Sequence, residues 1–224
     1  PHRYIDAVIL YLENKGIKKV GNDLKIKAGE TWDDVVKFAI LNNLQGIETL
    51  SWIPGKAGSA PIQNIGAYGT EIGDIIKSVY VFNRANNSFE IISKKGCDFS
   101  YRNSIFKKNP NKYIVAEVVI SLNRSEPQIP QYKDVQMYFE NKKTKKPSLL
   151  EIRDAIIKIR KSKLPDYNKI PNAGSYFTNP IVEKNLFKKL LSKYKDMPYF
   201  KIEGKVKIPA GFLIEKSGLK GKWV

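Results

Sequence analysis

Hydrophobic and polar residues alternate along short stretches in the first half of the chain, which is the period of a half-buried strand. Leu24, Ile26 and Ala28 alternate with polar neighbours and predict one such strand. Runs rich in apolar and β-branched residues predict further strands at 7–12, 79–83, 89–93 and 113–122, with a turn at 84–88. The first half of the chain is therefore predicted to be rich in strands.

A helical period appears after these strands and dominates the second half. Thr31 is placed to cap a helix over 32–42, and Ser148 with Glu151 forms a capping box before a second helix. Further amphipathic helices are predicted at 183–194 and from 209 to 215, after a proline-containing linker at 123–133. A strand-rich first part and a mostly helical second part indicate the α+β class.

The segment 51–70 fits neither period. It holds four glycines and two prolines, and Lys56 is its only charged residue. Such a segment is a poor helix or strand, and it is too apolar for an ordinary exposed loop. A buried loop must have its backbone N–H and C=O groups satisfied by something, and a bound cofactor is one answer. By composition alone, a buried structural loop is an equally good interpretation.

Composition narrows the classes of function. The chain has 224 residues, 42% of them hydrophobic, and a formal net charge of +17, which suggests anionic partners such as nucleic acid, anionic lipid or phosphorylated small molecules. The stretch 141–163 carries nine Lys and Arg against two acids, and a solvated helical face is the favoured explanation. No apolar run reaches the length of a membrane span. A single cysteine, Cys97, and a single histidine, His2, argue against disulfides and the usual zinc sites, so we expect no metal and a cytoplasmic location.

Four motifs occur in an order that resembles one protein family. The segment 54–69 closely resembles the flavin-binding loop of the UDP-N-acetylenolpyruvoylglucosamine reductases. Further matches follow at Cys97–Lys107, at Lys163–Pro180 with its Asn-Ala-Gly-Ser, and at Lys207–Gly221. Tyr132–Asp134 resembles the tyrosine-bearing loop of one branch of that family. Because four motifs appear in order over nearly the whole chain, the resemblance is highly specific.

The resemblance implies a flavoenzyme of peptidoglycan synthesis. NADPH would reduce bound FAD, and hydride would then pass to the enolpyruvyl group of a UDP-sugar, forming UDP-N-acetylmuramate. The implied fold is an FAD-binding domain of the vanillyl-alcohol-oxidase-like type over residues 1–145, with a linker and tyrosine loop near 123–140. A smaller α+β substrate-binding domain would follow over 146–224. We expect a monomer, with no nucleic-acid partner.

The resemblance also assigns roles to individual residues. Ser175 matches the proton donor, and Arg102 matches the residue that steadies the enolate and carboxylate. Residues matched to cofactor binding are Pro54, Gly55, Gly58, Ser59, Pro61, Gln63, Asn64, Ile65, Gly66 and Tyr101. Residues matched to substrate binding are Tyr132, Lys163, Asn179, Lys207 and Lys220. In isolation each has a simpler explanation: a turn serine, an ordinary salt bridge, a core aromatic or solvated lysines.

Two departures and two alternatives accompany this interpretation. The family's earlier flavin loop would precede Pro1, and its C-terminal catalytic glutamate would follow Val224, so we expect this stretch by itself to be inactive. A basic nucleic-acid-binding module is the main alternative, supported by charge and by aromatics such as Tyr194, Tyr199 and Phe200. Another FAD enzyme, such as an oxidase, is disfavoured because the motifs at 163–180 belong to the substrate domain.

Overall fold

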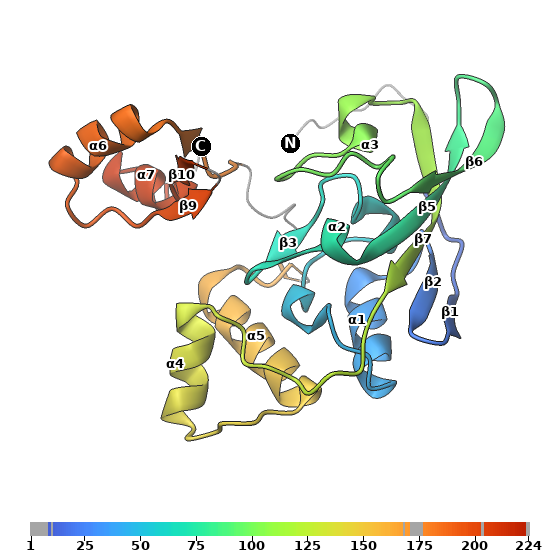
Figure 1. The fold of residues 1–224 in the computed structure, drawn as a ribbon, viewed down its shortest axis with the longest axis horizontal. Coiled ribbons are helices and arrows are strands. Elements are labelled where there is room, and N and C mark those ends of the chain that lie inside the picture. Colours follow the sequence, from blue (N-terminus) through green and yellow to red (C-terminus); the bar gives the residue numbers. More distant parts are fainter. Residues whose placement is uncertain (1–8, 10, 168, 171–176, 203, 223–224) are drawn as a thin grey trace. The chain divides into compact units, whose positions relative to one another are not determined.

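A computed structural model of the chain describes residues 9, 11–167, 169–170, 177–202 and 204–222. The chain divides into two compact units, Pro1–Asn172 and Ala173–Val224. The predicted α+β class is confirmed, since helices and strands occur in both units (Figure 1). From the sequence we divided the chain by function, with a cofactor-binding part up to residue 145 and a substrate-binding part from residue 146. This functional boundary stays a prediction.

A five-stranded antiparallel sheet forms the centre of the first unit. Its order is β1 (Ile17–Val20), β2 (Asp23–Lys27), β7 (Tyr113–Ser121), β5 (Ile76–Asn83) and β6 (Ser88–Ser93). The strands predicted at 24–28, 79–83, 89–93 and 113–122 are all present, with small shifts at their ends. The alternation is visible in β2, where Leu24 and Ile26 are fully buried and Lys25 is exposed. β1 was not predicted, because it is only four residues long and three of them are exposed.

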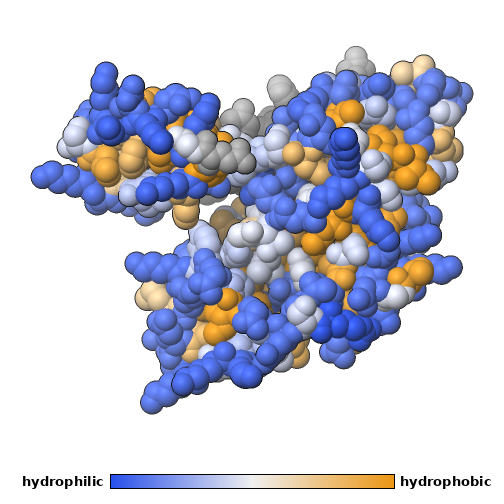
Figure 2. All heavy atoms as spheres, viewed as in Figure 1, coloured by the Kyte–Doolittle hydropathy of each residue, from blue (hydrophilic) through white to orange (hydrophobic). Residues whose placement is uncertain are grey.

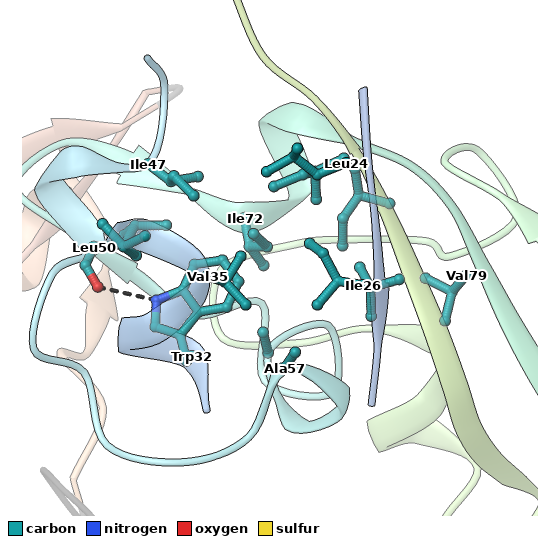
Figure 3. Close-up of a cluster of buried hydrophobic side chains, with 14 of the residues drawn as sticks. Leu24, Ile26, Trp32, Val35, Ile47, Leu50, Ala57, Ile72 and Val79 are labelled. Atoms are coloured by element: carbon teal, nitrogen blue, oxygen red, sulfur yellow. Dashed lines mark hydrogen bonds between the residues drawn. The ribbon is translucent and has the colours of Figure 1, made fainter. Parts of the chain in front are cut away.

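The main core lies between this sheet, helix α1 (Trp32–Leu41) and residues 51–70, the glycine-rich segment. Leu24, Ile26 and Val79 from the sheet gather with Trp32 and Val35 of α1 in one cluster (Figure 3). The indole N–H of Trp32 donates to the carbonyl of Leu50 over 3.0 Å, so the one polar atom of this large side chain is satisfied inside the core. Thr31 occupies the N-cap of α1 as predicted, but its hydroxyl makes no capping hydrogen bond.

Residues 48–75 and 105–108 form only short elements. These are η1 (Glu48–Leu50), η2 (Ala57–Ser59), β3 (Gly66–Ala67), β4 (Thr70–Glu71), α2 (Ile72–Ile75) and α3 (Ile105–Lys108). Ala57, Ala60 and Ile72 are buried in the main core. The glycine-rich segment is therefore part of the structural core along one side, rather than a loop that extends into solvent.

Two helices complete the first unit, and one of them was not predicted. α5 (Leu149–Lys163) begins at the predicted capping box, in which Ser148 and Glu151 bond each other's backbone N–H. α4 (Lys133–Asn141) overlaps the linker and tyrosine loop that we expected near 123–140, so that expectation is wrong for 133–140. The helix forms because Val135 and Phe139, spaced i,i+4, pack onto α5 in a second apolar cluster. We did not predict this helix from the sequence because most residues around Val135 and Phe139 are polar.

The second unit joins two helices to a small sheet. Helices α6 (Lys184–Lys193) and α7 (Ala210–Lys216) confirm the two predicted at 183–194 and 209–215. The antiparallel strands β8 (Ile181–Val182), β10 (Lys205–Lys207) and β9 (Phe200–Ile202) lie in that order. Two or three residues are too short to display an alternating period, which is why the sequence predicted only helices here.

The strand predicted at 7–12 falls largely outside the described residues. Of its positions only 9, 11 and 12 are described, and none of them belongs to a helix or strand.

Candidate cofactor and substrate site

The glycine-rich segment is fastened to the end of β2 by its own backbone. Gly58 donates its N–H to the carbonyl of Ala28 over 2.9 Å, and Ala57 donates to that of Glu30 over 2.8 Å. A Cβ on Gly58 would lie 2.6 Å from the Cβ of Ala28, so only glycine permits this approach. Part of the backbone hydrogen bonding for which a bound cofactor was one explanation is thus satisfied within the protein.

The residues predicted to bind cofactor differ in exposure along the segment. Gly55, Ser59 and Gln63 are exposed; Pro54, Ile65, Gly66 and Tyr101 are half-buried; Gly58, Pro61 and Asn64 are buried. Gly55 has a φ of +116°, a conformation that other residues rarely adopt. The exposed positions present glycine backbone, a hydroxyl and an amide, which are groups that a polar cofactor could bond.

Asn64 holds the segment together from the inside. Its Nδ2 donates to Glu71 Oε2 over 2.6 Å and to the carbonyl of Ser100 over 3.1 Å. Its Oδ1 accepts from the N–H of Gly73 over 2.8 Å. Both amide hydrogens are used within the protein, so the structure gives Asn64 a positioning role. Its predicted contact with the cofactor stays a prediction.

The structure brings Arg102 against the glycine-rich segment, joining two of the motifs. Its Nη2 donates to the carbonyl of Gly66 over 2.5 Å, and its Nη1 donates to the carbonyl of Asn64 over 3.1 Å. Glu71 Oε1 lies 3.5 Å from Nη1, and the guanidinium lies over the ring of Tyr101. Arg102 itself has a φ of +53°, an uncommon conformation for a long side chain. The result is a half-buried cation in a fixed orientation.

A mostly buried ion pair joins α1 to α5 beside the start of the same segment. Arg153 Nη1 and Nη2 donate to the two carboxylate oxygens of Asp33 over 2.8 and 2.6 Å. Asp33 Oδ1 also accepts from the backbone N–H of Trp52 over 2.6 Å. Burial by itself raises the pKa of Asp33, but the hydrogen bonds from Arg153 and Trp52 outweigh it and leave the pKa below its ordinary value.

Arg160 is a second cation next to this segment that the sequence did not single out. It lies close enough to Tyr68 for the two side chains to interact electrostatically, and its Nε donates to the carbonyl of Trp52 over 3.3 Å. Burial lowers the pKa of Arg160 and raises the pKa of Tyr68. The only sequence signal was an arginine in the last turn of a basic helix, which a solvated face explains equally well.

Tyr132 and Lys163, two of the predicted substrate residues, lie at adjoining ends of α4 and α5. The ring of Tyr132 meets that of Tyr68 edge-on, with 5.1 Å between centroids. Lys163 Nζ pairs with Asp134 Oδ2 over 2.5 Å, and Asp134 lies in the first turn of the helix whose N-cap is Tyr132. The motif at 163 and the tyrosine loop are therefore brought together in space.

Three other predicted substrate residues lie in the second unit. Asn179 Oδ1 accepts from the N–H of Ala210 over 2.8 Å at the start of α7. Lys207 ends β10, with its Nζ 5.7 Å from the ring centroid of Phe200. Lys220 pairs with Glu215 over 2.9 Å. The predicted proton donor, Ser175, lies outside the described residues.

Among the described residues, no helix is long and apolar enough to cross a membrane. In the same part of the chain, no group of three or more His, Cys, Asp and Glu side chains is placed to hold a metal ion.

Comparisons with known proteins agree with the motifs. Residues 3–89 match the model of the FAD binding domain family. The UDP-N-acetylenolpyruvoylglucosamine reductase of Flavobacterium johnsoniae is 38% identical, with 97% of this chain and 67% of that protein aligned. The protein of the same name from Bdellovibrio bacteriovorus is 40% identical, with 97% and 66% aligned. This chain spans about two thirds of the length of these relatives.

A solved structure supports the fold independently. The crystal structure of UDP-N-acetylenolpyruvylglucosamine reductase from Thermus caldophilus superposes with a TM-score of 0.57 at 23% identity, covering 89% of this chain and 55% of that one. At this identity the likeness concerns the fold alone. Together with the family match, it confirms the predicted flavin-binding fold.

Proposed function

Since this chain belongs to the UDP-N-acetylenolpyruvoylglucosamine reductase family, we propose that the whole protein reduces the enolpyruvyl group of UDP-N-acetylglucosamine enolpyruvate. The product is UDP-N-acetylmuramate, a peptidoglycan precursor, with FAD as the cofactor and NADPH as the reductant. The observation that carries the proposal is the bonding of Arg102 to the carbonyls of Gly66 and Asn64. It joins a residue matched to the enolate step with a segment matched to flavin binding. None of the comparisons supports the nucleic-acid alternative.

The glycine-rich segment fits a flavin in its chemistry. Gly55, Ser59 and Gln63 present donors and acceptors at its surface, while Gly58 and Pro61 are buried and hold its shape. A Cβ on Gly66 would lie 2.9 Å from Arg102 Nη1, so glycine at this position lets the guanidinium approach the backbone closely. Bound FAD supplies the hydride transfer, for which amino-acid side chains have no equivalent chemistry.

Arg102 has the charge and geometry for the substrate end of the reaction. Its guanidinium is oriented in advance by two backbone carbonyls, so little reorganisation is needed when negative charge develops on the substrate. Ser175 would donate the proton to carbon. A serine hydroxyl is a weak acid, which suffices toward a carbon as basic as that of an enolate.

Arg160 extends this proposal to the cofactor side. It is a half-buried cation that lies near Tyr68 and donates to the backbone carbonyl of Trp52, at the start of the glycine-rich segment. A cation in such surroundings stabilises nearby negative charge more strongly than it would in water. We therefore assign Arg160 to stabilising the electron-rich, reduced cofactor.

Lys163, Lys207 and Lys220 are assigned to the UDP-sugar, because lysines are plausible partners for its diphosphate. Lys163 and Lys220 each pair with one carboxylate, Asp134 and Glu215. Exposed pairs of this kind contribute little and can be exchanged for a more highly charged partner at low cost. Asn179 and Tyr132 complete the proposed set, with Tyr132 closing over the sugar.

The test is a two-step titration of the full-length protein without oxygen. We expect a flavin absorption band that bleaches on addition of NADPH and returns on addition of the enolpyruvyl UDP-sugar. In the Ser175→Ala variant, the flavin band should bleach normally with NADPH, but it should not return at the wild-type rate when the UDP-sugar is added. Ser192→Ala, the same change on the exposed face of α6, should behave as wild type. A protein that takes up no FAD would overturn the proposal.

We also propose a cytoplasmic monomer. The single cysteine, Cys97, is fully buried, which suits a reducing compartment where disulfides are rare. Sedimentation of the full-length protein at several concentrations would test the oligomeric state, and a mass that rises with concentration would contradict it.

A further inference from the structure

A small cavity of about 290 Å³ lies in the second unit, between α6 and the hairpin of β9 and β10. Its surface is mostly apolar, with Phe187 from the helix on one side and Val206 from β10 on the other. In Figure 2 this unit shows apolar surface bordered by hydrophilic residues. No motif of the sequence pointed to this cavity.

The apolar floor follows from the packing of α6 on the sheet. Val206 is 4% exposed and stands directly opposite Lys201 of β9 and Val182 of β8 in the strand register. Phe187 packs against Tyr199, with ring centroids 4.6 Å apart. The floor is therefore built from side chains that are held in place by neighbours.

Four lysines surround this floor: Lys184 and Lys188 from α6, and Lys201 and Lys205 from the hairpin. Lys205 pairs with Glu183 over 2.7 Å, but both side chains are more than half exposed, so the pair contributes little. Within the described part of the chain, Lys184, Lys188 and Lys201 have no ion pair. Lys184 and Lys188 are also spaced i,i+4 on one helix, an arrangement that is unfavourable for like charges.

We propose that this cavity binds a small organic anion with an apolar body, such as a short alkyl or single-ring compound bearing a sulfate, phosphate or carboxylate. The apolar floor would cover the body, and the lysine ammonium groups would bond the anionic oxygens. An anion would also relieve the repulsion among the four positive charges. The volume is near the lower end for ligand pockets, which sets the size of the compound.

This site is separate from the proposed substrate residues. Lys207 does not line the cavity, and Val206 of the floor points to the other face of β10; among the cavity lysines, Lys205 is the one that shares the face of Lys207. Lys207 lies opposite Phe200 in the register, whereas Val206 lies opposite Lys201. The inference therefore does not depend on the reductase activity, and it can be tested whether or not that activity is found.

The test compares three probes by titration calorimetry on the full-length protein. Octyl sulfate has the proposed combination, octyltrimethylammonium has the same body with the opposite charge, and inorganic sulfate has the charge without the body. Below the micellar concentration we expect one saturable site for octyl sulfate, at least about tenfold tighter than inorganic sulfate. Equal binding of octyl sulfate and inorganic sulfate would overturn the proposal, and so would equal binding of the cationic probe.

Charge reversal then locates the site. The double variant Lys188→Glu with Lys201→Glu should bind octyl sulfate about tenfold more weakly, or weaker still. Lys189→Glu with Lys195→Glu makes the same change in net charge at lysines that do not line the cavity, and should change the affinity by less than about twofold. All four side chains are exposed, so the fold should survive, which circular dichroism checks. If the control variant weakens binding by as much, the loss of affinity comes from the change in net charge, and the anion does not bind in this cavity.

Discussion

Arg153 of α5 and Asp33 of α1 form a two-point ion pair across 120 positions of the chain, with N–O distances of 2.8 and 2.6 Å. Arg153 is only 9% exposed. Asp33 also accepts from the backbone N–H of Trp52, at the entrance to the glycine-rich segment. One partly buried carboxylate thus connects both helices to the proposed cofactor segment.

Removing one partner of this pair should destabilise the fold strongly. We expect Arg153→Met to lower the free energy of unfolding by about 3–5 kcal/mol, because it leaves the Asp33 carboxylate buried without its cation. Urea unfolding followed by circular dichroism measures this. Lys146→Met breaks the exposed pair with Glu126, whose side chains are 82% and 61% exposed, and should cost less than about 1 kcal/mol. Similar losses in the two variants would contradict the burial argument.

The same carboxylate predicts a pH dependence of stability. Because the folded-state pKa of Asp33 lies below its ordinary value of 3.8, Asp33 binds protons more weakly in the folded state. Its contribution is therefore present above about pH 3.8 and is lost as the pH falls through the folded-state pKa. The stability difference between wild type and Asp33→Asn should be constant near neutral pH and shrink in acid. A difference that grows as the pH falls would contradict this sign.

Gly58 should not tolerate a side chain. Its added Cβ would lie 2.6 Å from the Cβ of Ala28, so we expect Gly58→Ala to cost about 1–3 kcal/mol through overpacking and to weaken FAD retention. Gly211→Ala is the matched control: it lies in α7, nothing stands within 4 Å of its added Cβ, and helix propensity should make it neutral or stabilising. Thermal unfolding compares the two. A neutral Gly58→Ala would mean that the segment can shift away from β2.

Cys97 should be chemically inert in the folded protein. Burial raises the pKa of its thiol to about 12, so almost no thiolate is present at pH 8. We expect a thiol reagent to react slowly with the native protein and fully in urea, at a rate that follows unfolding. Rapid labelling of the native protein would show that the residue is accessible.

The alternating strands, the capping box at Ser148 and the helices of the second unit were predictable because those signals are local, spanning a few consecutive residues. The cofactor segment and Arg102 were predictable only through resemblance, since composition left a structural loop equally plausible. α4 was missed because its apolar face, Val135 and Phe139, has meaning only against α5.

The sequence by itself therefore determined the class of fold, most of its regular elements and the family of the protein. Only the tertiary structure decided that Arg102 is held by the carbonyls of Gly66 and Asn64, that Arg153 finds Asp33, and that Arg160 lies beside Tyr68. It alone revealed the lysine-ringed cavity beside α6. These are contacts between segments far apart in the chain, whose energies depend on burial and on distance. Neither burial nor the distance between remote residues can be read from a short stretch of one sequence.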